Sequence, residues 1–166
     1  MKLTKLTVGI LTMSDSRAMG SGIADESGAI IKKIVELERY EVVAYNLISD
    51  DFDAIKSNLI QLSDEGLHLV LTTGGTGLSP RDNTPEATKA VLDKEVPGIS
   101  EAMRAYSLRI TPRALLSRGI SGIRKQTLII NLPGSPKAVR ENLEYILPQL
   151  QHGIEILRQE IKECGR

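Results

Sequence analysis

The sequence contains very little cysteine and carries no excess of charge of either sign. Cys164 is the only cysteine among 166 residues, so no intrachain disulfide can form and nothing indicates an oxidising compartment. Lysine plus arginine number 21, as do aspartate plus glutamate, so no net field steers the chain onto nucleic acid or an anionic membrane. We therefore expect no nucleic-acid partner and no membrane partner, and we expect local groups to hold any anionic ligand.

Histidine clusters and long apolar runs are also missing. His68 and His152 are far apart and belong to no HxxxH pair or Cys/His cluster, so we do not expect a zinc site. No apolar run approaches the roughly twenty residues of a membrane-spanning helix, and the N-terminus lacks the pattern of a signal peptide. These absences predict a cytoplasmic protein.

The residues that are present alternate between strand-like and helix-like patterns. The composition, with 41% hydrophobic and 25% charged residues, is ordinary for a globular protein, and the length suits one domain over residues 1–166. Apolar runs and helical periodicity define the elements. We predict strands at 5–13, 40–48 and 67–73, two short strands within 115–131, and helices at 25–38, 52–64, 85–94, 99–109 and 136–162.

This alternation predicts an α/β fold: a three-layer sandwich with a Rossmann-like, mainly parallel sheet and helices on both faces. Residues 14–22 read as a polar loop. Thr84 and Pro85 resemble the N-cap and first residue of a helix that Pro97-Gly98 should end. Pro148 should kink or split the last helix, because proline removes a backbone hydrogen bond there.

Polar, glycine-bearing segments follow the predicted strands. In open parallel sheets, ligands bind beyond the carboxyl ends of the strands, so these segments should converge on one rim. The segments are SDS at 14–16, SDD at 49–51, TGGTGLSPRDNTPEA at 73–87 and NLPGSP at 131–136.

The TGGTG segment at 73–77 has two interpretations. Its glycines allow backbone N–H groups to approach an anion closely, and successive N–H groups can form an anion-binding nest. A tight strand-to-loop turn without a ligand explains the pattern about equally well. The segment matches neither GxxxxGK[ST] nor GxGxxG, which disfavours a Walker loop and a nicotinamide site.

Two aspartates lie close to the turns of the expected rim. Asp82 could cap a helix or pair with Arg81, and either Asp50 or Asp51 could cap the helix at 52–64. Alternatively, Asp50 and Asp82 hold Mg²⁺, a hard cation that prefers oxygen ligands. The stiff NLPGSP turn is either a plain connector or a rigid shelf for a flat base or a phosphate.

These motifs together resemble the molybdopterin adenylyltransferase family, which includes the MogA/MoaB-type proteins and the G domain of gephyrin. The resemblance rests on TTGGTGLSPRDNTPEA, on PGISEAMR at 97–104, on SRGISGIRKQTLIINLPGSP at 117–136, and on the early SDS and DESG segments. It extends from about residue 6 to residue 150. One departure is His68, at a position where an aspartate is common in relatives; it should lie away from the rim and have no functional consequence.

The resemblance implies an activity, a cofactor and partners. The family adenylylates the terminal phosphate of molybdopterin with ATP and Mg²⁺, and pyrophosphate leaves. Because a phosphomonoester has its second pKa near ~6, its dianion can attack without a general base. The site must then supply positioning and charge neutralisation. Relatives are trimers or hexamers, and a separate protein inserts molybdate into the product.

Matching motif positions assigns roles to residues of this sequence. Asp50 and Asp82 are the expected catalytic and Mg²⁺-binding residues, and Asp25 and Ser27 either bind substrate or cap a helix. The remaining expected substrate- or nucleotide-binding residues are Ser14, Asp15, Ser16, Thr73, Gly74, Gly75, Thr76, Gly77, Thr84, Glu101, Arg104, Ser117, Arg118, Asn131, Leu132, Pro133, Gly134 and Ser135.

Two alternatives to an adenylyltransferase belong to the same fold. One is a non-catalytic molybdopterin-binding module or scaffold, which release of pyrophosphate would distinguish. The other is the molybdate-insertion protein. That protein carries further domains, and we expect 166 residues to leave no room for them.

Overall fold

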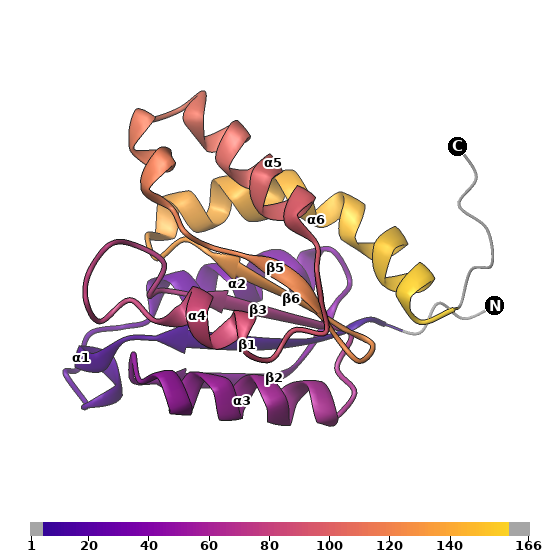
Figure 1. The fold of residues 1–166 in the computed structure, drawn as a ribbon, viewed down its shortest axis with the longest axis horizontal. Coiled ribbons are helices and arrows are strands. Elements are labelled where there is room, and N and C mark those ends of the chain that lie inside the picture. Colours follow the sequence, from indigo (N-terminus) through magenta and orange to yellow (C-terminus); the bar gives the residue numbers. More distant parts are fainter. Residues whose placement is uncertain (1–4, 160–166) are drawn as a thin grey trace.

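A single mixed sheet organises the fold (Figure 1). The structure is a computed structural model that describes residues 5–159, so Cys164 lies outside the described residues. The strand order is β2-β1-β3-β6-β5-β4. The strands are β1 (Thr7–Met13), β2 (Glu41–Ile48), β3 (Leu69–Thr73), β4 (Lys94–Glu95), β5 (Ser121–Arg124) and β6 (Thr127–Leu132). The first four strands in this order are parallel, and β5 pairs antiparallel with β6 and β4, which confirms the mainly parallel sheet.

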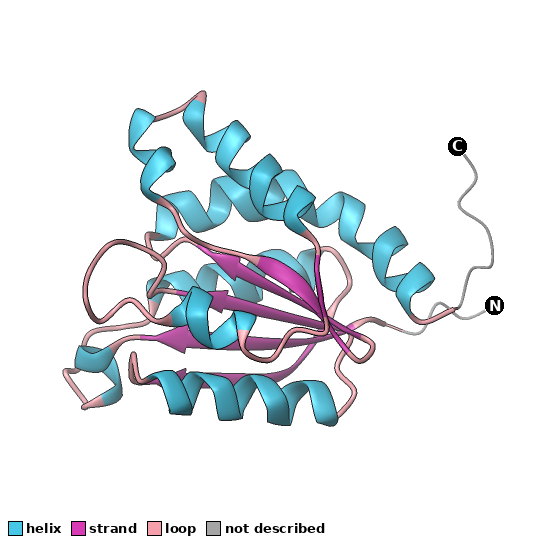
Figure 2. Ribbon diagram, viewed as in Figure 1, coloured by secondary structure: helices cyan, strands magenta, loops and turns pink. Residues whose placement is uncertain are grey.

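Helices cover both faces of the sheet, which confirms the three-layer sandwich (Figure 2). One face packs against α2, α5 and α6, and the other packs against α3 and α4. The helices are α1 (Asp15–Ala18), α2 (Glu26–Leu37), α3 (Phe52–Asp64), α4 (Thr84–Lys89), α5 (Pro97–Leu108), the 3₁₀ helix η1 (Pro112–Leu116) and α6 (Pro136–Leu157).

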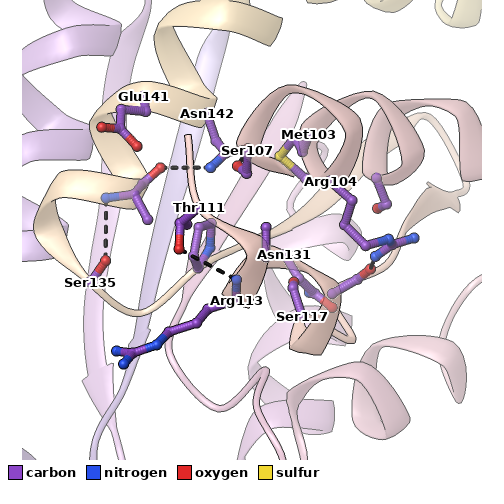
Figure 3. Close-up of a pocket in the computed structure, with 15 residues that line it drawn as sticks. Met103, Arg104, Ser107, Thr111, Arg113, Ser117, Asn131, Ser135, Glu141 and Asn142 are labelled. Atoms are coloured by element: carbon purple, nitrogen blue, oxygen red, sulfur yellow. Dashed lines mark hydrogen bonds between the residues drawn. The ribbon is translucent and has the colours of Figure 1, made fainter. Parts of the chain in front are cut away.

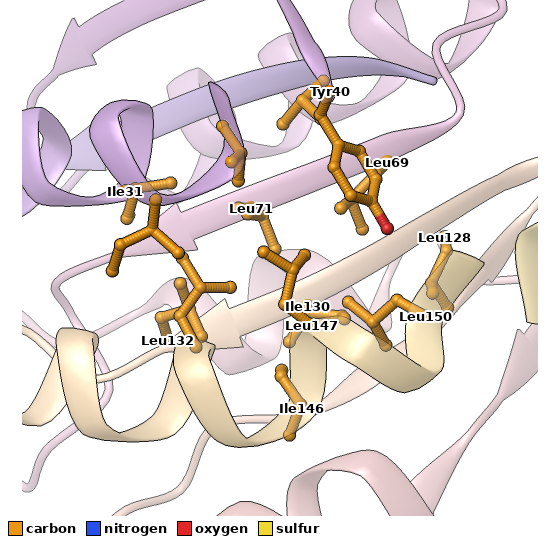
Figure 4. Close-up of a cluster of buried hydrophobic side chains, with 14 of the residues drawn as sticks. Ile31, Tyr40, Leu69, Leu71, Leu128, Ile130, Leu132, Ile146, Leu147 and Leu150 are labelled. Atoms are coloured by element: carbon orange, nitrogen blue, oxygen red, sulfur yellow. The ribbon is translucent and has the colours of Figure 1, made fainter. Parts of the chain in front are cut away.

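Side-chain alternation along the strands builds two separate cores. In β1, Val8 and Ile10 contribute to the core under α2 and α6, whereas Leu11 and Met13 contribute to the core under α3. Figure 4 shows the first of these cores, with side chains from β3, β6, α2 and α6 in contact. All five residues of β3 are buried, as expected for a strand covered on both faces.

Several predicted boundaries are wrong. The helix predicted at 85–94 ends at Lys89, because the chain then forms the short strand β4. Pro97 begins α5 instead of ending the preceding helix. The segment predicted as a loop contains the short helix α1, and the chain around residue 115 forms η1 before β5 begins at Ser121.

The ends of the long helices differ from the prediction in two details. Thr84 is the first residue of α4 and Asn83 is its N-cap, so the Thr84 hydroxyl does not cap the helix. Pro148 lies inside α6 without splitting it. Pro148 and Glu144 are both exposed, so water can reach the carbonyl that lacks its helical donor. Residues 160–162 of the predicted last helix lie outside the described residues.

His68 lies at the amino-terminal side of β3, where β1 also begins. Its Nδ1 is 2.7 Å from Thr7 Oγ1 and accepts the Thr7 N–H at 3.1 Å. The expected position away from the carboxyl edge is therefore correct. Within residues 5–159, no helix combines the length and the apolar character needed to cross a bilayer.

We predict that Leu71→Ala lowers the free energy of unfolding by about 2–5 kcal/mol, because Leu71 is fully buried in the sheet and its truncation leaves a cavity. Chemical denaturation measures the change. Leu115→Ala is the matched control, because Leu115 is 65% exposed on η1, and it should change stability by less than about 0.5 kcal/mol. Equal losses in the two variants would contradict this assignment of the core.

Candidate active site

The polar segments that follow β1, β2, β3 and β6 meet at one edge of the sheet. The four strands run parallel in the order β2-β1-β3-β6, so their carboxyl ends lie on the same side. The Thr73 hydroxyl donates to the carbonyl of Pro133 at 2.7 Å, which joins the loops after β3 and β6. The expected convergence of these segments is observed.

Asp15 and Asp50 hold the ends of β1 and β2 together by reciprocal hydrogen bonds. The Asp15 N–H donates to Asp50 Oδ2 at 3.0 Å, and the Asp50 N–H donates to Asp15 Oδ1 at 2.9 Å. Asp51, not Asp50, caps α3, since its side chain accepts the Ala54 N–H at 2.8 Å. Of the two aspartates that the sequence offered as the cap of this helix, Asp51 therefore has that role and Asp50 does not.

The loop after β3 turns back on itself through two glycines with positive φ, +95° at Gly74 and +65° at Gly75. A Cβ on Gly74 would lie 2.4 Å from the Met13 carbonyl oxygen. A Cβ on Gly75 would lie 2.4 Å from Thr84 Oγ1 and 3.1 Å from Asp50 Oδ1. Side chains are therefore excluded from this turn, and its backbone lies directly against the Asp50 carboxylate.

Asp82 adjoins the other end of the same loop. Its Oδ2 accepts the Ser79 N–H at 3.1 Å and would lie 2.8 Å from a Cβ on Gly77. The Arg81 side chain does not pair with Asp82, as one interpretation expected; it binds Asp15 instead. Asp50 and Asp82 therefore both adjoin one glycine-rich loop.

The pKa values of Asp50 and Asp15 shift in opposite directions. Burial raises the pKa of Asp50, and the neighbouring charges of Asp15 and Asp82 raise it further, against lowering contributions from the Asp15 N–H and Arg81. The hydrogen bonds from Arg81 and from the Asp50 N–H lower the pKa of the exposed Asp15. The rim thus concentrates negative charge around Asp50, which a bound cation would relieve.

The donor set suits Mg²⁺ that is shared with a phosphate ligand. Within residues 5–159, no group of three or more His, Cys, Asp or Glu side chains could enclose a metal ion. Asp50 and Asp82 each use Oδ2 for a backbone N–H, and no hydrogen bond from the described residues reaches either Oδ1. One or two carboxylates completed by substrate phosphates and water is the usual protein environment of Mg²⁺.

Arg118 fixes the loop that carries Asp82. Its guanidinium donates to the carbonyl oxygens of Gly77 and Asp82, both at 2.7 Å, and forms an ion pair with Glu86. Its backbone N–H donates to the carbonyl of the buried Thr76 at 2.9 Å. Arg118 therefore holds the loop in place, and its expected contact with substrate stays a prediction.

The early DESG segment reaches the same edge from α2. Asp25 caps α2 by accepting the Gly28 N–H at 3.0 Å, and it also accepts the Tyr45 hydroxyl. Burial and the Asp25 charge raise the pKa of Tyr45 above its ordinary range. Ser27 donates to the Gly134 carbonyl at 2.8 Å and so ties α2 to the loop after β6.

The remaining early residues and the β6 end have structural partners. Ser14 caps α1, and its Oγ is 3.3 Å from that of Ser16. The buried Asn131 side chain donates to Thr72 and Thr88 hydroxyls, each at 3.0 Å, and accepts the Ile120 N–H. Leu132 is fully buried in the core.

A cavity of about 250 Å³ lies next to the NLPGSP loop, between α5, η1, α6 and the end of β6 (Figure 3). Five expected site residues line it, whereas Glu101 is exposed on α5 and does not. These five are Arg104, Ser117, Asn131, Pro133 and Ser135.

Sequence reasoning missed other polar residues of this cavity. On α5, Ser100, Arg104 and Ser107 share one face at helical spacing, a signal that could have added the two serines. No comparable pattern marked those that come from η1 and α6. The other missed polar residues are Thr111, Arg113, Glu141 and Asn142.

Comparisons with known proteins agree with this geometry. The family described as "Probable molybdopterin binding domain" matches residues 9–152. A molybdopterin adenylyltransferase of Helicobacter pylori strain J99 is 42% identical and covers 90% of this chain and 86% of its own length. The gephyrin of Dictyostelium discoideum is 45% identical over 93% of this chain, which spans only 23% of that longer protein.

Solved structures support the fold as well. The molybdopterin biosynthesis enzyme MoaB of Thermus thermophilus superposes with a TM-score of 0.86 at 49% identity, covering 93% of this chain and 97% of that one. The family match covers residues 9–152, and the structural similarity extends over most of the chain. The chain therefore belongs to the molybdopterin-binding domain family.

Proposed function

We propose that the protein is a molybdopterin adenylyltransferase, which transfers the adenylyl group of magnesium-bound ATP to molybdopterin. The observation that carries the proposal is the placement of Asp50 and Asp82 against the same glycine-rich loop at the rim, where their charges interact. Relatives with this name are 42–45% identical over most of the chain, which supports the same assignment.

The reaction needs positioning and charge neutralisation more than acid–base chemistry. A phosphate oxygen of molybdopterin attacks the α-phosphorus of ATP, a new P–O bond forms, and the bond to the β-phosphate breaks with release of pyrophosphate. With a second pKa near ~6, the attacking phosphate is largely dianionic at neutral pH. A histidine base is therefore unnecessary, which is compatible with the location of His68 at the opposite edge of the sheet.

Asp50 and Asp82 are the residues that would hold Mg²⁺, each through its Oδ1. The ion, when bound, supplies neutralisation of the phosphate charge. The backbone of Gly74 and Gly75 can approach phosphate oxygens because no side chain shields it.

The cavity beside the loop after β6 supplies a place for a flat ring. A Cβ on Gly134 would lie 3.5 Å from the Gly74 Cα, so the glycine-rich loop and the cavity wall at Pro133 are direct neighbours. A ligand with a ring in the cavity would therefore present its phosphate to the loop. In the proposal, Pro133, Gly134 and Ser135 form a shelf for that ring.

The proposed partners are further copies of this chain and a molybdate-insertion protein that consumes the adenylylated product. We propose a homotrimer, with a hexamer as a higher assembly. The edge strand β2 supports association, because Val43, Tyr45 and Leu47 are 38–48% exposed on one side of it. Exposed apolar edge strands are normally covered.

Asp82→Asn should lower pyrophosphate release by more than about 10²-fold, because the nearly isosteric change removes a charge that organises the transition state. Mixing the protein with Mg²⁺, ATP and molybdopterin measures the release, and circular dichroism checks the fold. Asp64→Asn, which weakens the ion pairs of Asp64 with Arg124 and Lys125, is the matched control and should retain wild-type turnover. Wild-type turnover by Asp82→Asn would refute the role given to Asp82.

Chelation of divalent cations should abolish pyrophosphate release, and added Mg²⁺ should restore it. Without a cation, the negative charges of the two carboxylates and the triphosphate repel one another. Fluorescence titration should still detect molybdopterin binding in the chelator. Turnover at full rate without divalent cations would exclude the metal role. Molybdopterin binding without any turnover, even with Mg²⁺ and ATP, would identify a binding module instead.

Multi-angle light scattering should report the mass of three chains at micromolar concentration, because the family resemblance implies a trimer and β2 leaves apolar side chains to bury. Val43→Glu should dissociate the assembly if β2 is part of the interface, whereas Leu115→Glu on η1 is the control. A monomer for the wild-type protein would remove the trimer from the proposal.

A further inference from the structure

Arg81 makes an unusual contact at the rim. Its Nε and Nη2 donate to the two oxygens of the Asp15 carboxylate, both at 2.9 Å, in a two-pronged ion pair. Every side-chain hydrogen bond that Arg81 makes within the described residues goes to Asp15. The pair joins residues 66 positions apart, from the loop before α4 and from α1.

Arg81 is also an exposed cation at the acidic rim. Its charge interacts with those of Asp15, Asp50 and Asp51, and it precedes the metal-binding candidate Asp82 along the loop by one position. Its side chain is 58% exposed, so the guanidinium can move without disturbing a core.

The other arginine at this loop is differently placed. Arg118 binds two backbone carbonyls and Glu86, and its side chain is 33% exposed. Moving Arg118 would release the turn that carries Asp82. Arg81, in contrast, gives up one carboxylate contact when it moves.

Magnesium-bound ATP keeps a net negative charge, and at this rim it meets several carboxylates. Asp15 is one of them, and its Oδ1 already accepts the Asp50 N–H. A ligand phosphate beside Asp50 would therefore lie close to the Asp15–Arg81 pair. A guanidinium fork binds phosphate oxygens in the same two-pronged manner in which it binds a carboxylate.

We propose that Arg81 is a further catalytic residue of the adenylyl transfer. When the nucleotide arrives, the Arg81 guanidinium moves away from Asp15 and binds the phosphates of ATP. The inference rests on the proposed function. Asp15 stores the guanidinium near the reacting centre and competes with the nucleotide for it. Arg81 forms and breaks no covalent bond; it neutralises charge that the pyrophosphate group gains as it leaves.

A structural tie between α1 and the loop is the competing explanation for the same ion pair. Under that explanation, removing either partner weakens nucleotide binding to the same extent, because both changes break the same contact. Under the proposal, the two changes act in opposite directions on nucleotide binding. Arg81→Gln removes the phosphate ligand, whereas Asp15→Asn removes its competitor and a repelling charge.

The test uses calorimetry to measure the dissociation constant of the protein for magnesium-bound α,β-methylene-ATP, without molybdopterin. Arg81→Gln should weaken binding by roughly 10–100-fold, the effect of losing charge-assisted hydrogen bonds. Asp15→Asn should tighten it by roughly fivefold, the effect of one unit charge at about 4 Å in water. The asparagine retains an oxygen to accept the Asp50 N–H.

Pyrophosphate release then separates this inference from the proposed function. If the wild-type protein releases none with Mg²⁺, ATP and molybdopterin, the proposed function fails. If the wild-type protein turns over, Arg81→Gln should lose roughly 10²-fold in kcat/KM and Arg81→Lys should recover part of it. Arg140→Gln, which breaks the exposed ion pair with Glu144 on α6, is the control and should match the wild type.

Two results would overturn the role of Arg81. One is equal weakening of nucleotide binding by Arg81→Gln and Asp15→Asn, which indicates a structural tie. The other is wild-type nucleotide binding and turnover by a folded Arg81→Gln protein. Melting temperatures of all variants establish that each is folded under the assay conditions.

Discussion

The approach of a bare backbone turn to the ends of neighbouring strands is the constraint on which the rim depends. At Gly74 there is no space for a side chain above the Met13 carbonyl, and at Gly75 the space is taken by Thr84 and Asp50. The turn can therefore lie against Asp50 and against the loop after β6. Reciprocal hydrogen bonds between Asp15 and Asp50 then fix the adjoining strand ends, so that backbone and acidic groups reach one small region from distant parts of the sequence.

Local patterns were sufficient to predict most of the architecture. Alternating apolar runs and helical periodicity gave the three layers and the mainly parallel sheet, because burial on both faces leaves a clear signal in a strand such as β3. Errors arose where tertiary context decides. The two-residue strand β4 exists because it pairs with β5, and Pro97 begins a helix because the chain turns after that pairing. The pairing of β4 has no signature in the local sequence, whereas Pro97 stands at the first helical position, which proline favours.

The site was predictable to the extent that its residues follow strands. The glycine turn, Asp50 and Asp82 stand at or after strand ends, and a parallel sheet brings such positions together. Pairs formed across long distances were not predictable. The sequence offered Asp82 as the neighbour of Arg81, whereas the fold supplies Asp15, and the cavity takes polar groups such as Glu141 from α6. Side-chain direction on helices and loops decides these contacts, and spacing alone does not encode it.

The edge of the sheet opposite the rim bears on how the chain can be joined to other polypeptide. β1 begins there beside His68, and the described chain closes there too, where the Arg158 guanidinium is 3.5 Å from the Gly66 carbonyl. Both ends of the described chain therefore lie on the side opposite the rim, and domain insertion is tolerated best where chain ends lie close together at the surface. This geometry is compatible with the match of the chain to one part of a gephyrin several times its length. A unit with this geometry can be joined to further polypeptide without rearranging the rim.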